Sequence, residues 1–185
     1  EKRNYIGFLM VLMQRLVSSS TRSIRTTLER RLAVLEDSLP QIPLACSPND
    51  DWWDLEPEEQ IDEAIRAERS SHQTETTQVR LLLDLARRCE AARPDAKVER
   101  LVDLIYSRRG EENDPDLKFL IFTEFVPTQQ MLTEYLTARG VSVVCLNGSM
   151  DMDERRRTQQ AFATDAQVMI STEAGGEGLN LQFCH

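Results

Sequence analysis

The sequence predicts an α/β fold in which a parallel β-sheet domain follows a mostly α-helical segment. From Asn4 to about Gly110, apolar residues recur every three or four positions, which is typical of amphipathic helices. After Asp114 the pattern changes to three short apolar runs separated by two helical stretches. Alternation of strands and helices is typical of a parallel sheet whose strands are connected by helices. We therefore expect two domains, residues 1–110 and 114–185.

The first well-marked helix begins behind the Ser/Thr run at residues 18–21, which can cap its start, and Pro40 and Pro43 end it. One face of this helix is expected to be apolar: Ile24, Leu28, Leu32, Leu35 and Leu39. Further helices are expected at residues 58–71 and 77–92. The expected inner positions of the second of these are Val79, Leu82, Leu83 and Ala86.

A last helix of the first domain is predicted at residues 95–107. Asp95 is its expected N-cap, and Gly110 stands where a C-terminal cap belongs.

Residues 40–57 are expected to form an irregular connection rather than a helix or strand. They contain four prolines, a cluster of acidic residues and the pair Trp52-Trp53. Two exposed tryptophans would be costly, so we expect them to fold back against the helices. The alternative is that this acidic loop binds a protein partner.

The second domain is predicted to contain strands at 117–122, 141–146 and 168–171. Between them we expect helices at 127–139, closed by Gly140, and at 151–164. Their expected inner positions are Met131, Leu132, Tyr135 and Leu136 in the first helix, and Met152, Thr158, Ala161 and Phe162 in the second.

Polar turns follow each of the three predicted strands, at 123–127, 147–151 and 171–178. In a parallel sheet such turns emerge on the same carboxyl edge. Each carries a hydroxyl, and two of them carry glycine, which lets backbone N–H groups approach an anion closely. Together the turns can hold a row of phosphates and position a nucleic acid without reading its sequence.

Other phosphate sites and common catalytic sites are excluded by the residues present. A P-loop needs a lysine directly after its last glycine, but the chain's lysines are Lys2, Lys97 and Lys118. The dinucleotide fingerprint fails because Leu181 stands where its third glycine is required. Only His72 and His185 could serve a serine–histidine triad, and neither is near a serine in a recognisable pattern. No catalytic residue is predicted.

The amino-acid composition bears on metal sites, on membrane spanning and on the binding of polyanions. The four cysteines are widely separated, so no zinc site is predicted, and a reduced, cytoplasmic protein is the expectation. The longest apolar run, 5–13, is too short to span a bilayer, so no membrane partner is expected. The net charge of −9 argues against general binding of polyanions, although the basic segment 1–35 could face a nucleic acid.

Three segments resemble motifs IV, IVa and V of superfamily-two helicases. Their amino-acid sequences are most similar to those of bacterial Swi/Snf-type ATPases. They are Leu120-Ile-Phe-Thr-Glu-Phe125; Leu146-Asn-Gly-Ser-Met150 followed by Asp153-Glu-Arg155; and Ser171-Thr-Glu-Ala-Gly-Gly-Glu-Gly-Leu-Asn180. The resemblance covers Asp95 to His185. It implies that residues 114–185 are a partial RecA-like, parallel three-layer sheet domain, a truncated C-terminal motor lobe. Residues 1–110 would then be an inter-lobe linker or insertion.

The resemblance also implies roles for individual residues. Thr123, Gly148, Ser149 and Thr172 would contact the nucleic-acid backbone. Glu177, Gly178 and Asn180 would line the ATP cleft between two lobes. For the cluster Arg155–Arg157 we expect a solvated helix face on which Arg155 pairs locally.

The first motor lobe with its P-loop, and motif VI with its arginine finger, are missing from this sequence. We therefore expect a fragment of a DNA translocase that is not active alone. ATP, Mg and duplex DNA would be bound by the intact parent, together with the missing N-terminal lobe, and no ATP or Mg by this fragment. The alternatives are an RNA helicase or restriction-type motor lobe, and a non-catalytic protein-interaction module.

Overall fold

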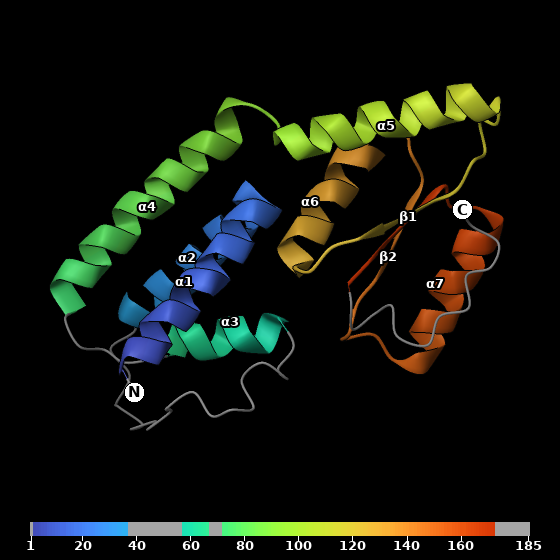
Figure 1. Cartoon of the computed structure of the whole chain (residues 1–185). Helices are drawn as coiled ribbons and strands as arrows, with labels where there is room; N and C mark the ends of the chain where they lie inside the picture. Colours follow the sequence, from blue (N-terminus) through green and yellow to red (C-terminus); the bar gives the residue numbers. More distant parts are fainter. Residues whose placement is uncertain (1, 37–56, 67–71, 173–185) are drawn as a thin grey trace. The chain divides into compact units, whose positions relative to one another are not determined.

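The computed structural model describes residues 2–36, 57–66 and 72–172 (Figure 1). The chain forms two compact units, residues 1–93 and 94–185. This boundary lies earlier than the one predicted at 110–114. The reason is that helix α5 (Ala96–Glu112) buries Val98 and Ile105 in the core of the sheet domain, so it belongs to the second unit.

The first unit is helical, as expected. It consists of α1 (Lys2–Ser19), α2 (Thr21–Glu36), α3 (Pro57–Arg66) and α4 (His72–Ala92). Helices α2 and α4 pack on each other through the predicted apolar faces, which are Leu28, Ile24, Leu32 and Leu35 on α2 and Val79, Leu83 and Ala86 on α4. Leu39 and the loop at 40–57 lie outside the described residues.

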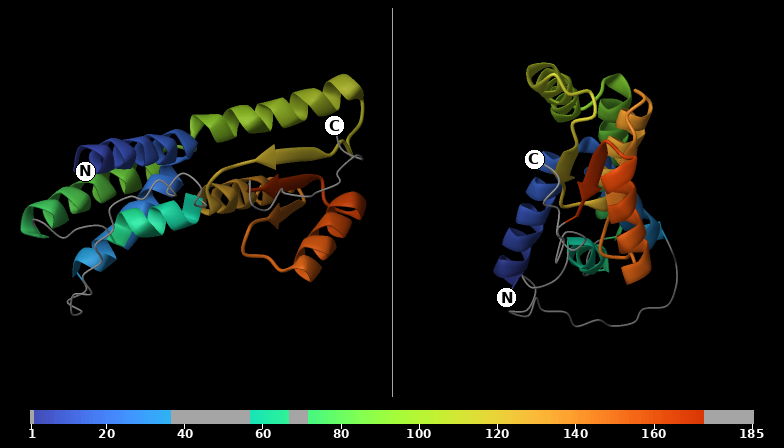
Figure 2. Two further views of the ribbon diagram at one scale, coloured as in Figure 1. Left: turned by 60° about the horizontal axis from the view of Figure 1, so that its bottom comes forward. Right: turned by 90° about the vertical axis from the view of Figure 1, so that its right-hand side faces the viewer.

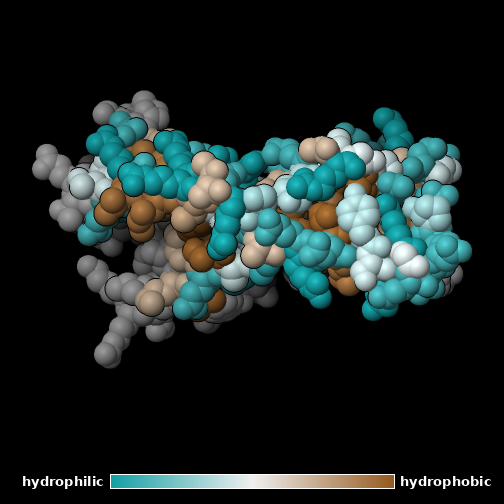
Figure 3. All heavy atoms as spheres, turned by 90° about the horizontal axis from the view of Figure 1, so that it is seen from above, coloured by the Kyte–Doolittle hydropathy of each residue, from teal (hydrophilic) through white to brown (hydrophobic). Residues whose placement is uncertain are grey.

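Leu82 is not an inner residue of α4, contrary to the expectation. It is 51% exposed, beside the exposed Leu81 and Leu85. Val79, Leu83 and Ala86 make the contact with α2, and Leu82 lies at the flank of this face. Figure 3 shows apolar atoms among polar ones on the side of the molecule where α4 lies.

The predicted N-cap of α2 is confirmed at Ser20, the single residue between α1 and α2. Its Oγ accepts a hydrogen bond of 3.1 Å from the backbone N–H of Ser23. Ser23 in turn donates its hydroxyl to the carbonyls of Leu16 (2.7 Å) and Ser20 (2.8 Å). These buried hydroxyls satisfy backbone groups that the helix junction would leave unpaired.

Ion pairs link α2 to α4 along their length. One pair joins Arg31 to Glu75, with Nε to Oε1 at 2.8 Å. The others are Arg22–Glu90, Arg25–Glu90, Arg87–Glu29 and Arg80–Glu36. Together with Arg30, which pairs with Asp62 of α3, four of the seven basic residues of segment 1–35 are paired with carboxylates inside the helical unit. This pairing argues against the expectation that segment 1–35 faces a nucleic acid.

The second unit contains a parallel sheet in the order β1-β3-β2, formed by β1 (Phe119–Phe122), β2 (Val143–Leu146) and β3 (Val168–Ser171). Helices α6 (Val126–Thr137) and α7 (Met152–Thr164) connect successive strands. All three predicted strands and both connecting helices are confirmed, so the second unit is of the α/β class.

Alternate residues of the strands face opposite layers of helices. On one side, Val168, Ile170, Phe119, Ile121 and Val143 pack with α5 and α6. On the other side, Met169, Leu120 and Val144 pack with Phe162 of α7. The views in Figure 2 show the strands between α5 and α7. The predicted three-layer sheet domain is confirmed.

Two details of the predicted helices are wrong. The first is the cap of α5: the helix runs through Gly110, and Asn113 ends it in the left-handed conformation (φ 52°), which Asn adopts more readily than most residues. The second is Met152, an expected inner residue, which is 66% exposed at the start of α7, whereas Phe162 alone fills the α7 side of the core. Gly140 follows α6 with φ 77°, as expected of a terminating glycine.

Candidate nucleic-acid interface

The first two polar turns and the start of the third, Ser171-Thr172, meet at the carboxyl edge of the sheet, as predicted; residues 173–178 of the third turn lie outside the described residues. Phe122 and Leu146, the last residues of β1 and β2, are both in register with Ser171, the last residue of β3. The turns are also bonded to one another. Thr123 donates its N–H to the Ser171 carbonyl at 3.0 Å, and Thr172 donates to the Leu146 carbonyl at 2.9 Å. The structure thus brings Thr123, the 147–151 loop and Thr172 together.

The first turn leads from β1 into α6. Thr123 is half-buried there, and Phe125 is the N-cap of α6 and is fully buried. Phe125 cannot accept a hydrogen bond, so the N-cap residue itself makes no side-chain cap. The backbone dipoles of α6 place partial positive charge at this end, and the carboxylate of Glu124 in the same turn offsets part of it.

The second turn is held in shape by hydrogen bonds between its own residues and by Arg155 of α7. Asn147 Oδ1 accepts hydrogen bonds from the backbone N–H of Ser149 (3.2 Å) and from its hydroxyl (2.7 Å). From α7, Arg155 donates to the carbonyls of Met150 (3.2 Å) and Gly148 (3.4 Å). Gly148 and Ser149 remain exposed at the surface. Ser149 therefore has a visible role in ordering the loop, while its contact with a phosphate stays a prediction.

A capping box closes this turn and starts α7. Asp151 accepts a hydrogen bond from the backbone N–H of Glu154, and the Glu154 side chain accepts one from the N–H of Asp151, at 2.8 and 3.0 Å. The two carboxylates offset the positive end of the α7 dipole. The start of α7 is therefore less suited to an anion than the start of α6.

The third turn begins with two buried residues. Ser171 is fully buried and donates its hydroxyl to the Thr172 carbonyl at 2.9 Å. Thr172 is 6% exposed, so its contact with an outside ligand would be made at a small accessible area. The predicted ATP-cleft residues Glu177, Gly178 and Asn180 lie outside the described residues.

Gln129 is the residue of this edge that the sequence analysis missed. It lies on α6 and is 2% exposed. Its side-chain Nε2 donates to the carbonyls of Leu146 (2.9 Å) and Ile170 (2.8 Å), and its Oε1 accepts from Asn147 Nδ2 at 3.4 Å. A sequence signal exists: Gln129 falls on the same face of α6 as Leu132 and Leu136, both buried, and a polar residue at an inner helix position needs buried partners.

The positions of Arg155, Arg156 and Arg157 agree with the prediction of a solvated helix face on which Arg155 pairs locally. Arg155 pairs locally with the loop carbonyls, and Arg156 and Arg157 are exposed on α7. Within the described residues, Arg155 is therefore the one member of the cluster that is bonded to the 147–151 loop.

Cys145 is a half-buried thiol near the end of β2. Burial raises the pKa of its thiol, and a hydrogen-bonding contact of 3.0 Å with the Thr133 hydroxyl opposes that rise. The thiol therefore stays neutral near pH 7 and makes no charged contribution to the edge.

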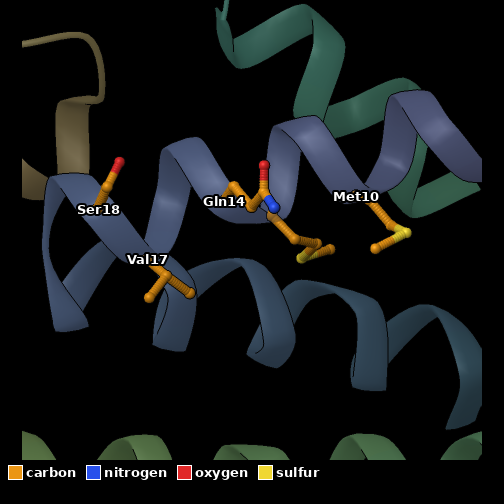
Figure 4. Close-up of a pocket in the computed structure, with 5 residues that line it drawn as sticks. Met10, Gln14, Val17 and Ser18 are labelled. Carbon is orange, nitrogen blue, oxygen red and sulfur yellow. The ribbon is translucent and has the colours of Figure 1, made fainter.

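Other kinds of site receive little support from the described residues. Within 2–36, 57–66 and 72–172, no group of three or more His, Cys, Asp or Glu is placed to hold a metal ion. An apolar hollow is lined by Met10, Met13, Gln14, Val17 and Ser18 of α1 (Figure 4) and contains no titratable side chain. Over the same described part of the chain, no helix is both long and apolar enough to cross a membrane.

Comparison with known proteins agrees with the motifs read from the sequence. The family described as "Helicase conserved C-terminal domain" matches residues 96–185. An uncharacterized ATP-dependent helicase of Bacillus subtilis, YqhH, is 38% identical over 91 residues, which are 49% of this chain and 15% of that protein. The chromatin-remodeling ATPase INO80 of Gibberella zeae is 33% identical over 88 residues, 46% of this chain and 4% of that protein.

Among solved structures, the C-terminal part of the Fun30 ATPase domain matches 92% of this chain and 68% of its own chain, with a TM-score of 0.41 and 15% identity. The matched segments are a small part of the curated relatives. The predicted resemblance to the C-terminal lobe of superfamily-two helicases is confirmed, because residues 96–185 match the helicase conserved C-terminal domain family.

Proposed function

We propose that this chain is part of a Swi/Snf-type, ATP-driven DNA translocase, and that the carboxyl edge of its sheet holds the backbone of duplex DNA. The observation that carries the proposal is the meeting of the first two polar turns and the start of the third on one edge, where Thr123, Gly148, Ser149 and Thr172 lie. The family match and the relatives named as ATP-dependent helicase and chromatin-remodeling ATPase support it.

The chemistry of the edge suits a phosphate backbone. Its groups are backbone amides and hydroxyls, which bind phosphate oxygens without distinguishing bases, and the positive end of the α6 dipole lies beside them. Arg156 and Arg157 are exposed on the helix that follows the second turn, where they would attract a polyanion. The arginines of α2 are engaged with carboxylates of α4 and α3, so the edge is the better candidate for this contact.

ATP use is proposed for the whole protein and not for this chain alone. Glu177, Gly178 and Asn180 would face the nucleotide, and Mg would accompany it in the parent. The sequence has no glycine followed by lysine, and therefore no P-loop to hold the phosphates of ATP. The chain is expected to supply nucleic-acid contacts and one wall of a cleft that a second lobe completes.

Binding of the purified chain to a fluorescent duplex DNA, measured by anisotropy at increasing KCl, tests the proposal. We expect binding that weakens steeply as salt is raised. Thr123→Ala should weaken binding, whereas Thr137→Ala, at the exposed far end of α6, should leave it unchanged.

Two results would contradict the proposal. One is duplex binding that Thr123→Ala leaves unchanged or that does not respond to salt. The other is binding to a single-stranded RNA of equal length that is clearly tighter than binding to the duplex, which would favour an RNA helicase.

A further inference from the structure

The buried amide of Gln129 is bonded to the ends of β2 and β3 and to Asn147, the first residue of the second turn. It projects from α6, whose N-cap Phe125 belongs to the first turn. It donates to Leu146, where the second turn begins, and to Ile170, just before the third. Its oxygen accepts from Asn147, the residue that shapes the second turn.

All the hydrogen-bonding groups of this side chain are used. A primary amide has two N–H donors, and both are directed at strand carbonyls, at 2.9 and 2.8 Å. The Leu146 carbonyl also accepts the N–H of Thr172. This one oxygen therefore accepts hydrogen bonds from Gln129 of α6 and from Thr172 of the third turn. A fully satisfied buried network holds its members in one arrangement.

The network reaches the exposed loop in two steps. Gln129 Oε1 fixes the amide of Asn147, and the other end of that amide, Oδ1, holds the N–H and hydroxyl of Ser149. The orientation of the loop that carries Gly148 and Ser149 therefore depends on a residue that is buried on another element.

We propose that Gln129 is a positioning residue, which couples the 147–151 loop to the end of β3 so that the loop and Thr172 present one continuous surface to the nucleic-acid backbone. This inference rests on the proposed function for its ligand, but the coupling itself can be measured without DNA. Gln129 would not touch the nucleic acid, since it is buried.

The test compares Gln129→Met with Gln130→Met, a matched control at the exposed neighbouring position of α6. Amide hydrogen exchange is measured by NMR at Ser149 and Thr172, and at Val168 at the opposite end of β3. We expect Gln129→Met to speed exchange at Ser149 and Thr172 by about tenfold or more relative to Val168, as local loosening predicts. Gln130→Met should match the wild type.

A purely structural role gives a different result. If Gln129 only stabilises the domain, exchange at Val168 and Thr172 will accelerate equally, which would overturn the proposal. If Gln129→Met fails to fold, Gln129→Asn decides the question, because it keeps a buried amide but shortens it by one methylene and leaves Asn147 in place. It should loosen Ser149 and Thr172 without changing Val168, and an unchanged Ser149 would overturn the coupling.

The affinity for duplex DNA distinguishes the positioning role of Gln129 from the proposed function of the chain. The folded Gln129→Met chain should bind the fluorescent duplex several-fold more weakly than the Gln130→Met chain. Equal affinities of the two variants would overturn the role in positioning. Absence of duplex binding by the wild type would instead defeat the proposed function, and the exchange rates would then decide the coupling alone.

Discussion

The ammonium group of Lys118 donates a hydrogen bond of 2.7 Å to the carbonyl of Phe162. It donates a second bond, of 2.9 Å, to the carbonyl of Ala166. Lys118 precedes β1, and both carbonyls lie at or just beyond the last turn of α7, where helix carbonyls lack partners within the helix. A single lysine thus ties the helix on one face of the sheet to the start of an edge strand.

Replacing Lys118 by Met should therefore destabilise the second unit. Two charge-assisted hydrogen bonds and a favourable interaction with the helix dipole are lost, which together cost about 1–3 kcal/mol. Urea unfolding followed by NMR signals of β3 measures the change. Lys97→Met is the control, because Lys97 is exposed on α5, and an equal loss in both variants would contradict the capping role.

The capping box of α7 gives a second stability prediction. Asp151→Ala removes the acceptor for the Glu154 N–H and should lower the free energy of unfolding by about 1 kcal/mol. Asp153→Ala, an exposed carboxylate in the same first turn without this bond, should cost less. Equal losses in urea titrations of the two variants would show that charge at the helix start, and not the cap, is what stabilises α7.

The different burial of two ion pairs predicts that their coupling free energies differ. The side chains of Arg31 and Glu75 are 14% and 31% exposed, whereas those of Arg88 and Asp84 are 74% and 51% exposed. A double-mutant cycle with Arg31→Met and Glu75→Gln should give a coupling of about 1 kcal/mol that weakens in high salt. The same cycle on Arg88 and Asp84 should give a coupling near zero, and equal couplings would contradict the importance of burial.

Cysteine reactivity tests the environment of β2. Burial raises the pKa of the Cys145 thiol, so iodoacetamide near pH 8 should modify Cys145 much more slowly than the exposed Cys89. Because the folded-state pKa is raised, the stabilising effect of the neutral thiol is present below about pH 8.5 and is lost as pH rises beyond it. Peptide mass spectrometry measures the rates at which iodoacetamide modifies Cys145 and Cys89. Similar rates in the folded chain would contradict the burial of Cys145, while similar rates are expected in urea.

Most of the sheet domain could be predicted because its local signals agree. Short apolar runs bounded by turn residues specify the strands, and Gly140 and Asp95 mark helix ends by known backbone chemistry. The position of the three turns on one edge follows from the parallel arrangement alone, and the register of Phe122 and Leu146 with Ser171 confirms it.

What could not be predicted depends on long-range contacts. Gln129 bonds to carbonyls 17 and 41 residues away in sequence, which no local pattern reveals. The basic residues of α2 looked available to a nucleic acid until their partners on α4 were known, 44 residues away in the case of Arg31 and Glu75. The end of α5 was misplaced because Gly110 and Asn113 can both adopt the left-handed conformation, and packing decides between them.

The most direct test of the account is to map where duplex DNA binds on this chain. In a ¹⁵N–¹H NMR titration with a short duplex, the amide signals of Thr123, Gly148, Ser149 and Thr172 should shift together, and those of α2 and α4 should stay in place. Shifts confined to α2 and α4, with the carboxyl edge of the sheet unaffected, would contradict it.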